Sequence, residues 1–462
     1  MRNASWIIRW NPNDARFWDA TGRRTARRNL FWSIFAEFLG FSVWQLWSAV
    51  AVNLNRNGFH LTLGQLFWLV SIPGLVGATM RFPYGFVVAR VGGRNWTVIS
   101  VALLLIPSAL LAVLVQHPGT PYWALIAAAA TAGFGGGNFA SSMANISYFY
   151  PDSKKGWALG LNAAGGNIGV AVVQFVVPAV IGLGVLGLAA HRAAHLSLQW
   201  AGLVWLPFIV VAMIGAFFFM NNLAVARATM RQQLVILRRR QTWIMSWLYV
   251  GTFGSFIGYS AAFPLLIKSQ FPHVNPLEFA FLGPLIGSLT RPMGGRLADR
   301  LGGAPVTFVN FIVMIAATLG VVWTLGMKAS PGAFPVFLTL FLVLFVTTGI
   351  GNGSTFRMIP AAFRKEHMRR AGNGGARELD RADRDARTEA AAALGFTSAI
   401  AAYGSFVIPQ AYSASITGTG SAAAALLGFV AFYASCVGVT WWFFLRGSAH
   451  EAAMPSLAEA SV

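Results

Sequence analysis

The chain has little charge, few acidic residues and almost no cysteine. Only 10% of its 462 residues are charged and 56% are hydrophobic, whereas a soluble domain has about 25% charged residues. The single cysteine, Cys436, cannot form an internal disulfide, and we expect a buried, inert thiol. This composition excludes an ordinary soluble domain and indicates a protein that lies mostly within a membrane.

Catalytic groups are scarce in the apolar part of the sequence. The seven histidines lie in expected loops or at the ends of apolar runs, and Glu37 is the only carboxylate well inside a run. An active site needs an acid, a base, a nucleophile or a set of metal ligands. We therefore expect no enzymatic activity, no metal site and no cofactor. The glycine-rich stretch Gly133–Gly137 lies inside an apolar run, so it favours close helix packing over a dinucleotide-binding loop.

The sequence instead contains a series of long apolar runs. A run of about 20 apolar residues can cross a bilayer as a helix. Twelve such runs cover approximately residues 30–53, 63–89, 97–116, 122–149, 156–186, 198–220, 242–267, 279–298, 304–327, 334–362, 390–414 and 421–445. They predict an all-α membrane protein with 12 transmembrane helices. Because the first run starts late and has no small-residue cleavage site, we expect no cleavable signal peptide.

The basic residues are concentrated in alternate loops. There are 34 lysines and arginines against 14 acidic residues, a net charge of +20. Most of them precede the first apolar run or follow the second, fourth, sixth, eighth and tenth runs. This positive-inside bias predicts that both termini lie in the cytoplasm, where the basic loops face anionic lipid headgroups. The charge is therefore explained by membrane topology, and we expect no nucleic-acid partner.

Two arginines interrupt apolar runs at equivalent positions. A cation in hydrocarbon costs about 2.5 to 3.5 kcal/mol on insertion scales, so it usually faces a cavity and has a function. The strings RFPYGFVVARVGG from Arg81 and RPMGGRLADRLGG from Arg291 align at a constant offset of 210 residues, and the fourth and tenth runs each contain a GxGxG motif. This internal repeat predicts two pseudo-symmetric six-helix halves with a site between them, as is typical of transporters.

The repeat also predicts the boundaries of the chain's segments. We expect an N-terminal cytoplasmic segment at 1–29, a six-helix bundle at 30–223 and a cytoplasmic inter-bundle loop at 224–241. A second bundle covers 242–446, and a cytoplasmic tail covers 447–462. The polar segment 363–389 within the second bundle mixes both charge signs and has no aromatic residue, so it predicts a solvated cytoplasmic loop with some helix.

The two arginines have no evident acidic partners. A salt bridge from Arg81 to Glu37 is the structural alternative, and Arg291 has no obvious intramembrane acid. The functional interpretation is an anion site between the two halves. A guanidinium group is planar, always charged and forked, so it suits a planar oxyanion better than an ammonium group does.

Polar and aromatic partners are expected on the helices beside these arginines. Asn167 lies in the middle of the fifth run, and Phe139 follows the GxGxG motif of the fourth. Tyr249 and Phe253 are four residues apart on the seventh run, so they share a helix face. The alternatives are an interhelical hydrogen bond for Asn167, and packing or lipid contact for the phenylalanines.

Long strings of the sequence resemble a known family. They are GGGNFASSMANISYFYP at 135–151, ALGLNAAGGNIGV at 158–170, GTFGSFIGYSAAF at 251–263, GRLADRLGG at 295–303, GNGSTFRMIP at 351–360 and AAALGFTSAI at 391–400. Over nearly its whole length the chain resembles the NarK-like nitrate/nitrite porters of the major facilitator superfamily. The resemblance implies the major facilitator fold, transport of nitrate and nitrite in nitrate assimilation, a bacterial inner-membrane location and a monomer.

The resemblance also implies roles for individual residues. Arg81 and Arg291 match the arginines that hold the anion, Asn167 and Tyr249 match its hydrogen-bonding partners, and Phe139 and Phe253 match the aromatic pair that sandwiches it. The fifth and eleventh runs match glycine-rich signature helices, with Gly160, Gly165, Gly166, Gly169, Gly395 and Gly404.

The sequence departs from the family at two positions. Ala89 replaces the acid of the first-half loop, and Glu37 lies in a first helix that is usually apolar. The absent acid removes one side of a symmetric charge network at the loops, and Glu37 becomes a candidate for ion coupling.

The charges of the two arginines favour an exchange mechanism. Two like charges about 8 Å apart repel by roughly 2 kcal/mol at an effective dielectric of 20, so a carrier loaded with an anion closes more easily than an unloaded one. We therefore expect nitrate-in, nitrite-out antiport by alternating access. The alternatives are nitrate:proton symport through Glu37 or a loop histidine, a membrane sensor that binds the anion without moving it, and an organic-anion transporter.

Overall fold

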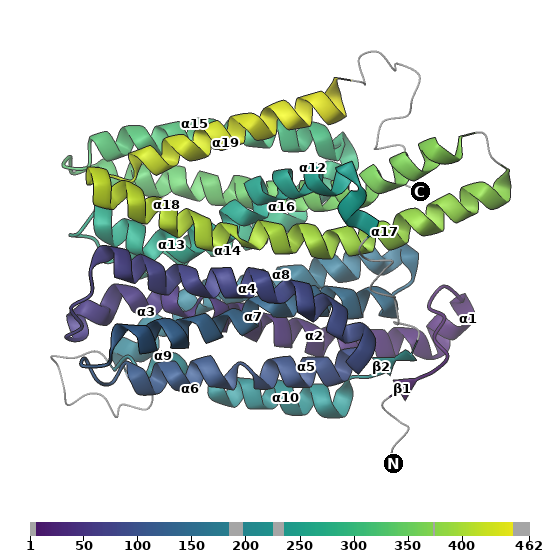
Figure 1. Cartoon of the computed structure of the whole chain (residues 1–462), viewed down its shortest axis with the longest axis horizontal. Coiled ribbons are helices and arrows are strands. Elements are labelled where there is room, and N and C mark those ends of the chain that lie inside the picture. Colours follow the sequence, from purple (N-terminus) through teal and green to yellow (C-terminus); the bar gives the residue numbers. More distant parts are fainter. Residues whose placement is uncertain (1–5, 184–196, 225–234, 373–374, 447–462) are drawn as a thin grey trace.

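The computed structural model describes residues 6–183, 197–224, 235–372 and 375–446. Its helices run side by side in two bundles, with α2 to α10 in one and α12 to α19 in the other (Figure 1). In the described residues, the only sheet is a parallel pairing of the two-residue strands β1 and β2. The all-α architecture with two halves is therefore confirmed.

The first half consists mainly of helices, and the first long one, α2, begins at residue 23. Its elements are β1 (Trp6–Ile7), α1 (Ala15–Phe17), η1 (Trp18–Gly22), α2 (Arg23–Trp44), α3 (Leu46–Leu54), η2 (Asn55–Asn57), α4 (Leu63–Val91), α5 (Gly93–Ala102), α6 (Leu105–Leu114), α7 (Tyr122–Phe149), α8 (Asp152–Leu183), α9 (Trp200–Leu203), α10 (Leu206–Phe219) and β2 (Asn222–Leu223). A capping box between Thr62 and Gln65 starts α4, because it satisfies backbone N–H groups that the first helical turn leaves free.

The second half repeats this plan. Its elements are η5 (Val235–Arg238), α12 (Arg240–Tyr249), η6 (Val250–Gly254), α13 (Ser255–Gln270), η7 (Pro276–Glu278), α14 (Leu282–Leu301), α15 (Gly303–Gly326), α16 (Ala333–Ala371), α17 (Ala376–Ala402), α18 (Gly404–Thr419), α19 (Ala423–Thr440) and η8 (Trp441–Leu445). The helices α4 and α14 end at Gly92 and Gly302, whose φ angles are +91° and +88°. These glycines are 210 residues apart, so the sequence repeat is also a repeat of backbone conformation.

Each predicted run corresponds to one helix or to consecutive helices. The first crossing, for example, consists of α2 and α3, and the seventh of α12, η6 and α13. In the described residues, ten crossings are long and apolar enough to span a membrane on hydropathy alone. The other two are α7, which contains the glycine-rich stretch, and α14, which contains Arg291 and three further charges near its end. The two crossings that hydropathy alone does not detect are therefore the glycine-rich helix α7 and the helix with Arg291, whereas α4 with Arg81 is detected.

Glycines allow the helices within each half to approach closely. A Cβ atom at Gly135 of α7 would lie 2.1 Å from the carbonyl oxygen of Gly40 on α2. In the second half, a Cβ atom at Gly349 of α16 would lie 2.2 Å from the carbonyl oxygen of Gly287 on α14. Neither position has room for a side chain, as expected for glycine-lined helix contacts.

The N-terminal segment folds against the end of the bundle. The indole Nε1 of Trp10 donates to the carbonyl of Tyr148 at 3.0 Å, and Asn13 Nδ2 donates to Asp152 Oδ2 at 3.2 Å. The first and last described elements, β1 and η8, lie at the same end of the molecule (Figure 1). An even number of crossings requires this, and the cytoplasmic side of that end stays a prediction. Part of the expected inter-bundle loop, 225–234, and the expected tail, 447–462, lie outside the described residues.

The polar segment 363–389 differs in shape from the expected loop. In its described residues α16 continues to Ala371 and α17 begins at Ala376, and both helices project beyond the bundle (Figure 1). Ion pairs hold the two helices together and to the first half. Arg364 Nε lies 3.0 Å from Asp383 Oδ1, and Arg387 Nη1 lies 2.7 Å from Asp152 Oδ2. Charge pairs between and along helices therefore stabilise a segment that has more helix than the loop with some helix that its composition predicted.

Candidate anion-binding site

Arg81 is buried in α4 and binds backbone carbonyls of both halves. Its side chain is 2% exposed. Its Nε donates to the carbonyl of Gly136 on α7 at 3.0 Å, and its Nη1 donates to the carbonyl of Ser398 on α17 at 2.9 Å. A Cβ atom at Gly136 would lie 2.6 Å from the Trp44 ring, so glycine is required for this approach. The cation therefore joins the two halves, and no acidic residue in the described part of the chain forms an ion pair with it.

Aromatic rings surround the Arg81 guanidinium. Its central carbon lies 4.7 Å from the ring centroid of Phe139, 5.1 Å from Phe253, 5.3 Å from Trp44 and 5.9 Å from Phe41. A desolvated cation–π contact contributes about 2 kcal/mol, so the rings offset part of the cost of burying the charge. Phe41 and Trp44 were not predicted. They are three residues apart on α2, and only the rotation of that helix shows that they face Arg81.

Phe139 and Phe253 form a narrow aromatic slot between the halves. Their ring centroids are 6.1 Å apart with an interplanar angle of 23°, and Tyr249 also stacks on Phe253, with the ring centroids 5.4 Å apart. Tyr249 and Phe253 thus share a helix face as expected, although Phe253 lies in the π-helical turn η6. A flat ion between two rings needs a centroid separation of about 7 Å, or two carbon contact distances. The slot must therefore widen by about 1 Å to admit one.

Arg291 is the second buried cation of the site. It lies on α14, is 5% exposed and has its guanidinium carbon 5.4 Å from the ring centroid of Phe356. Its two terminal nitrogens form no hydrogen bond of normal geometry among the described residues, although the Tyr249 phenol is close enough to the guanidinium to interact with it as a hydrogen-bond partner. Tyr249 interacts electrostatically with both Arg291 and Arg81. The phenol therefore lies between the two cations that the repeat relates.

Several donors on the predicted site residues are buried without a hydrogen bond of normal geometry. In the described part of the chain these are Arg81 Nη2, Arg291 Nη1, Arg291 Nη2, Tyr249 Oη and Asn167 Nδ2. An unsatisfied buried polar group costs about 1 to 3 kcal/mol, and more when it is charged. Five unpaired donors, with two cations among them, favour a small ligand that has negative charge and several acceptor oxygens.

Asn167 is the predicted residue with the weakest structural connection to the others. It lies on α8 and is 1% exposed, and neither atom of its amide group has a partner among the described residues. The neighbouring Gly166 packs against Glu37 on α2. The burial of this unpaired amide is compatible with the predicted role, but no direct contact joins it to the rings or the arginines, so that role stays a prediction.

Of the structural alternatives from the sequence, the Arg81–Glu37 salt bridge and lipid contact by the phenylalanines do not fit the structure, whereas packing of the phenylalanines does. Glu37 forms no ion pair with Arg81 in the described residues, because its carboxylate accepts hydrogen bonds from Ser142 and Asn162 instead. Phe139 is 2% exposed and Phe253 is fully buried, so neither ring faces lipid. Among the described residues the arginines therefore have no carboxylate ion-paired with them, and the rings face the interior of the molecule.

The six predicted signature glycines fall into two groups. Gly165, Gly166 and Gly169 pack against Ile34, Glu37 and Phe38 of α2, and Gly404 packs against the backbone of Gly254. At Gly160 and Gly395 no heavy atom lies within 4 Å of an added Cβ atom. Close packing therefore explains the first four glycines, and it does not explain Gly160 or Gly395.

A family comparison agrees with this architecture. The model of the Major Facilitator Superfamily matches residues 30–373. The chain belongs to the Major Facilitator Superfamily. Membership of this superfamily accounts together for the twelve crossings, the two repeated halves and the buried interface between them.

Proteins named as transporters or extrusion proteins for nitrate or nitrite are similar to the chain over most of its length. The nitrate/nitrite transporter NarU of Escherichia coli (strain K12) is 45% identical over 452 residues, which cover 96% of this chain and 97% of NarU. The probable nitrate/nitrite antiporter NarK2 of Thermus thermophilus is 37% identical, with 97% and 98% covered. The nitrite extrusion protein of Bacillus subtilis (strain 168) is 26% identical, with 88% and 91% covered. This superfamily member therefore groups with the NarK-like porters.

Proposed function

We propose that this protein exchanges nitrate for nitrite across the bacterial inner membrane by alternating access. The observation that carries the proposal is the set of buried, unpaired donors on Arg81, Arg291 and Tyr249, next to an aromatic slot formed by one ring from each half. The names of the NarU and NarK2 relatives support the same substrates.

The chemistry of the site favours small, flat anions. Nitrate and nitrite are planar, with delocalised negative charge and acceptor oxygens in the plane. Forked guanidinium groups donate in a plane, and the Phe139 and Phe253 rings restrict the thickness of the ligand. Phosphate and carboxylates with bulky tails are too thick for such a slot, which argues against the organic-anion alternative.

The missing counter-ion favours exchange over one-way transport. With no anion bound, closing the halves brings two cations together in a desolvated space, where they repel by roughly 2 kcal/mol at about 8 Å. A bound anion removes this penalty, so the carrier changes sides when it is loaded. Exchange of one monovalent anion for another also moves no net charge, and so avoids about 2.3 kcal/mol for each 100 mV of membrane potential.

The interface between the halves is suited to opening on either side. Thr79 Oγ1 lies 3.0 Å from the hydroxyl of Tyr403, and further along α4 and α18 Gln410 Nε2 donates to Ser71 Oγ at 2.6 Å. These neutral hydrogen bonds are worth only about 0.5 to 1.5 kcal/mol each. Separating the halves at α4 and α18 therefore breaks weak neutral bonds, while the bond from Arg81 to Ser398 and the ion pair of Arg387 with Asp152 are charged contacts between the halves that must also break.

Counterflow in proteoliposomes tests the proposal. Vesicles containing the purified protein are loaded with nitrite or with inert buffer, and entry of isotopically labelled nitrate is followed. We expect entry only when nitrite is inside. Accumulation driven by a pH gradient with no internal anion would show proton symport instead. Binding of nitrate without any flux would show a sensor, and equal competition by a bulky carboxylate would show an organic-anion transporter.

A further inference from the structure

Glu37 is a buried carboxyl group that the anion site does not use. It lies on α2 with no exposed surface. Its Oε2 accepts a hydrogen bond from Asn162 Nδ2 on α8 at 2.7 Å and another from Ser142 Oγ on α7, and Ser142 Oγ is in turn 3.2 Å from Ser33 Oγ. Its Oε1 has no partner among the described residues. The carboxyl group is thus held by neutral groups on one oxygen only.

These neighbours suit a group that gains and loses a proton. An ionised carboxylate in the membrane interior needs a cation or donors on both oxygens, and Glu37 has neither. Serine hydroxyls and an asparagine amide can each donate or accept a hydrogen bond. They can stabilise the anion as donors and hold the neutral acid as acceptors, and the unpaired Asn162 Oδ1 offers a further acceptor.

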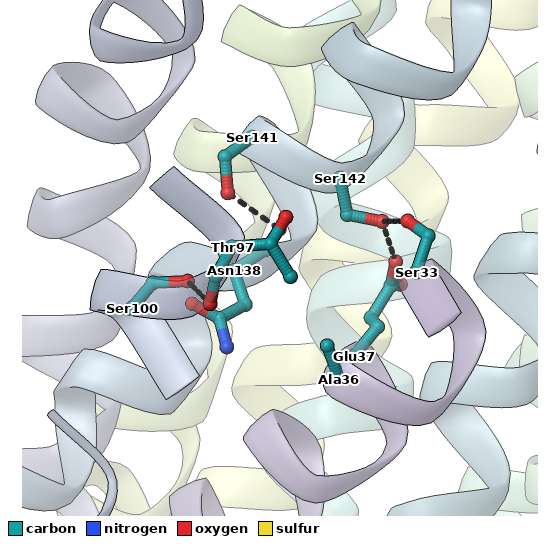
Figure 2. Close-up of a pocket in the computed structure, with 8 residues that line it drawn as sticks. All are labelled: Ser33, Ala36, Glu37, Thr97, Ser100, Asn138, Ser141 and Ser142. Atoms are coloured by element: carbon teal, nitrogen blue, oxygen red, sulfur yellow. Dashed lines mark hydrogen bonds between the residues drawn. The ribbon is translucent and has the colours of Figure 1, made fainter. Parts of the chain in front are cut away.

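A small polar cavity gives Glu37 a place to exchange a proton. Figure 2 shows Glu37 turned toward Ser142 and Ser33 on one side of the pocket, with the other polar residues on the opposite side. The pocket is lined by Ser33, Ala36, Glu37, Thr97, Ser100, Asn138, Ser141 and Ser142. Its volume of about 10 Å³ is close to the room that one water molecule needs. A water molecule in this pocket would bond to these hydroxyl and amide groups and would be the immediate partner of the carboxyl in proton transfer.

The same three helices connect Glu37 to the anion site. On α2, Phe41 lies one turn after Glu37, and its ring is 6.1 Å from that of Phe139. On α7, Ser142 comes three residues after Phe139, and on α8 the glycine that contacts Glu37 precedes Asn167. Electrostatic interactions reach Glu37 from both Arg81 and Arg291. A negative charge at Glu37 therefore opposes the binding of an anion between these arginines.

No other charged group is placed to pair with Glu37. The titratable and charged side chains on the elements packed against α2 are Asp19 on η1, Arg81, Tyr84 and Arg90 on α4, Arg94 on α5, Tyr122 and Tyr148 on α7, and Asp152, Lys154 and Lys155 on α8. None of them forms an ion pair with Glu37 in the described residues. Because Glu37 does not reach Arg81 either, it cannot replace the anion as a counter-ion.

We propose that Glu37 is a proton-binding site and that the proton and the anion bind together. The inference rests on the proposed function in one respect, namely that the anion binds between Arg81 and Arg291. It adds that each anion is carried with a proton on Glu37, so exchange of nitrate for nitrite leaves the proton balance at zero. By linkage, protonation strengthens anion binding, and anion binding favours protonation by the same factor.

Proton uptake on nitrate binding tests the proposal. Nitrate is added to the purified full-length protein in weakly buffered detergent solution, and an indicator dye reports protons taken up across a pH series. We expect uptake that approaches one proton per bound nitrate in the range where Glu37 is ionised. Over that range the nitrate Kd should rise about tenfold per pH unit. In Glu37→Gln, which mimics the neutral acid, uptake should vanish and the Kd should be independent of pH.

Glu278→Gln is the matched control. The Glu278 carboxyl is exposed and accepts a hydrogen bond from Asn275 Nδ2 at 3.0 Å, outside the bundle core, so this variant should take up protons like the wild type. If Glu37→Gln fails to fold, Ser142→Ala is used. Loss of the Ser142 donor should move proton uptake to higher pH, and an unchanged range contradicts the proposal.

Three results overturn the inference. They are proton uptake in Glu37→Gln equal to that of the wild type, nitrate binding by the wild type without uptake at any pH, and nitrate affinity that depends on sodium ions rather than on protons. Each of them leaves the proposed function intact as long as nitrate binds and exchanges. Absence of nitrate binding in the wild type contradicts the proposed function itself.

Discussion

Replacement of Arg81 by lysine keeps the charge and removes the fork. In the wild type, Nε and Nη1 each hold a carbonyl, at Gly136 and Ser398, and Nη2 stays unpaired for a ligand. A lysine ammonium is a single nitrogen on a flexible stem. It cannot satisfy both carbonyls and also donate to an anion in one plane.

The expected loss of affinity follows from the contacts removed. One hydrogen bond to a charged group contributes about 1.5 to 3 kcal/mol, and each 1.4 kcal/mol corresponds to a factor of ten in Kd. If only the ligand-directed contact of Arg81 is lost, nitrate should bind about 10- to 100-fold more weakly in Arg81→Lys. The remaining charge should preserve some binding, so affinity should fall without disappearing.

Nitrate titration of the purified variants measures this effect. Arg94→Lys is the control, because Arg94 Nε also donates to a backbone carbonyl, that of Phe217 at 2.7 Å, and its guanidinium lies 4.6 Å from the Phe217 ring, but on an exposed surface. The control should bind nitrate normally. Near wild-type affinity in Arg81→Lys, with Arg94→Lys equally unaffected, would refute the argument that the forked geometry of Arg81 holds the anion.

Other predictions concern packing, selectivity and the projecting helices. Gly404→Ala should reduce the amount of folded protein on size-exclusion chromatography, since its Cβ atom would lie 2.3 Å from the Gly254 carbonyl oxygen and overpacking costs about 1 to 3 kcal/mol. Gly395→Ala is the control and should not reduce it, because there is open space around Gly395. Phe253→Leu should weaken nitrate binding several-fold by removing an aromatic contact of about 0.5 to 1.5 kcal/mol and should let pyramidal chlorate compete better; unchanged competition contradicts the slot. Arg387→Gln should lower the free energy of unfolding by no more than about 1 kcal/mol, because the ion pair of Arg387 with the first half is exposed. A larger loss would contradict this expectation.

The sequence was sufficient to predict the crossings and the repeat. Apolar runs long enough to span a bilayer are a local property, so hydropathy found them without tertiary information. Hydropathy alone was weakest for α14, where Arg291 and the charges at its end lower the apolar character. The alignment of Arg291 with Arg81 identified this helix, because a duplicated position is expected to have a duplicated structure.

Side-chain surroundings could not be predicted in the same way. The rings of Phe41 and Trp44 face Arg81 because of how α2 is rotated against α4, and no spacing in the sequence reports that rotation. The partners of Glu37 could not be predicted from spacing either, since Ser142 and Asn162 lie on other helices and far from Glu37 along the chain. An apolar run therefore predicts the length of a helix. Which side chains of that helix meet polar partners depends on its contacts with neighbouring helices.

The helical form of 363–389 was underestimated for a related reason. Its composition of mixed charges fits both an irregular loop and a pair of helices. The choice depends on whether opposite charges meet, as Arg364 and Asp383 do across the two helices. Such pairing depends on the register of α16 against α17, which composition does not contain.

The hydrogen bond from Arg81 to Ser398 has a consequence for genetic studies of this protein. The acceptor is a main-chain oxygen, which every amino acid supplies. Substitutions at residue 398 would therefore leave the acceptor in place, and their effects would reflect only the packing of this fully buried side chain. A screen for compensating substitutions would not recover a partner for Arg81 there. The link between the halves is encoded by the path of the backbone, and it would become visible only in variants that shift α17 as a whole.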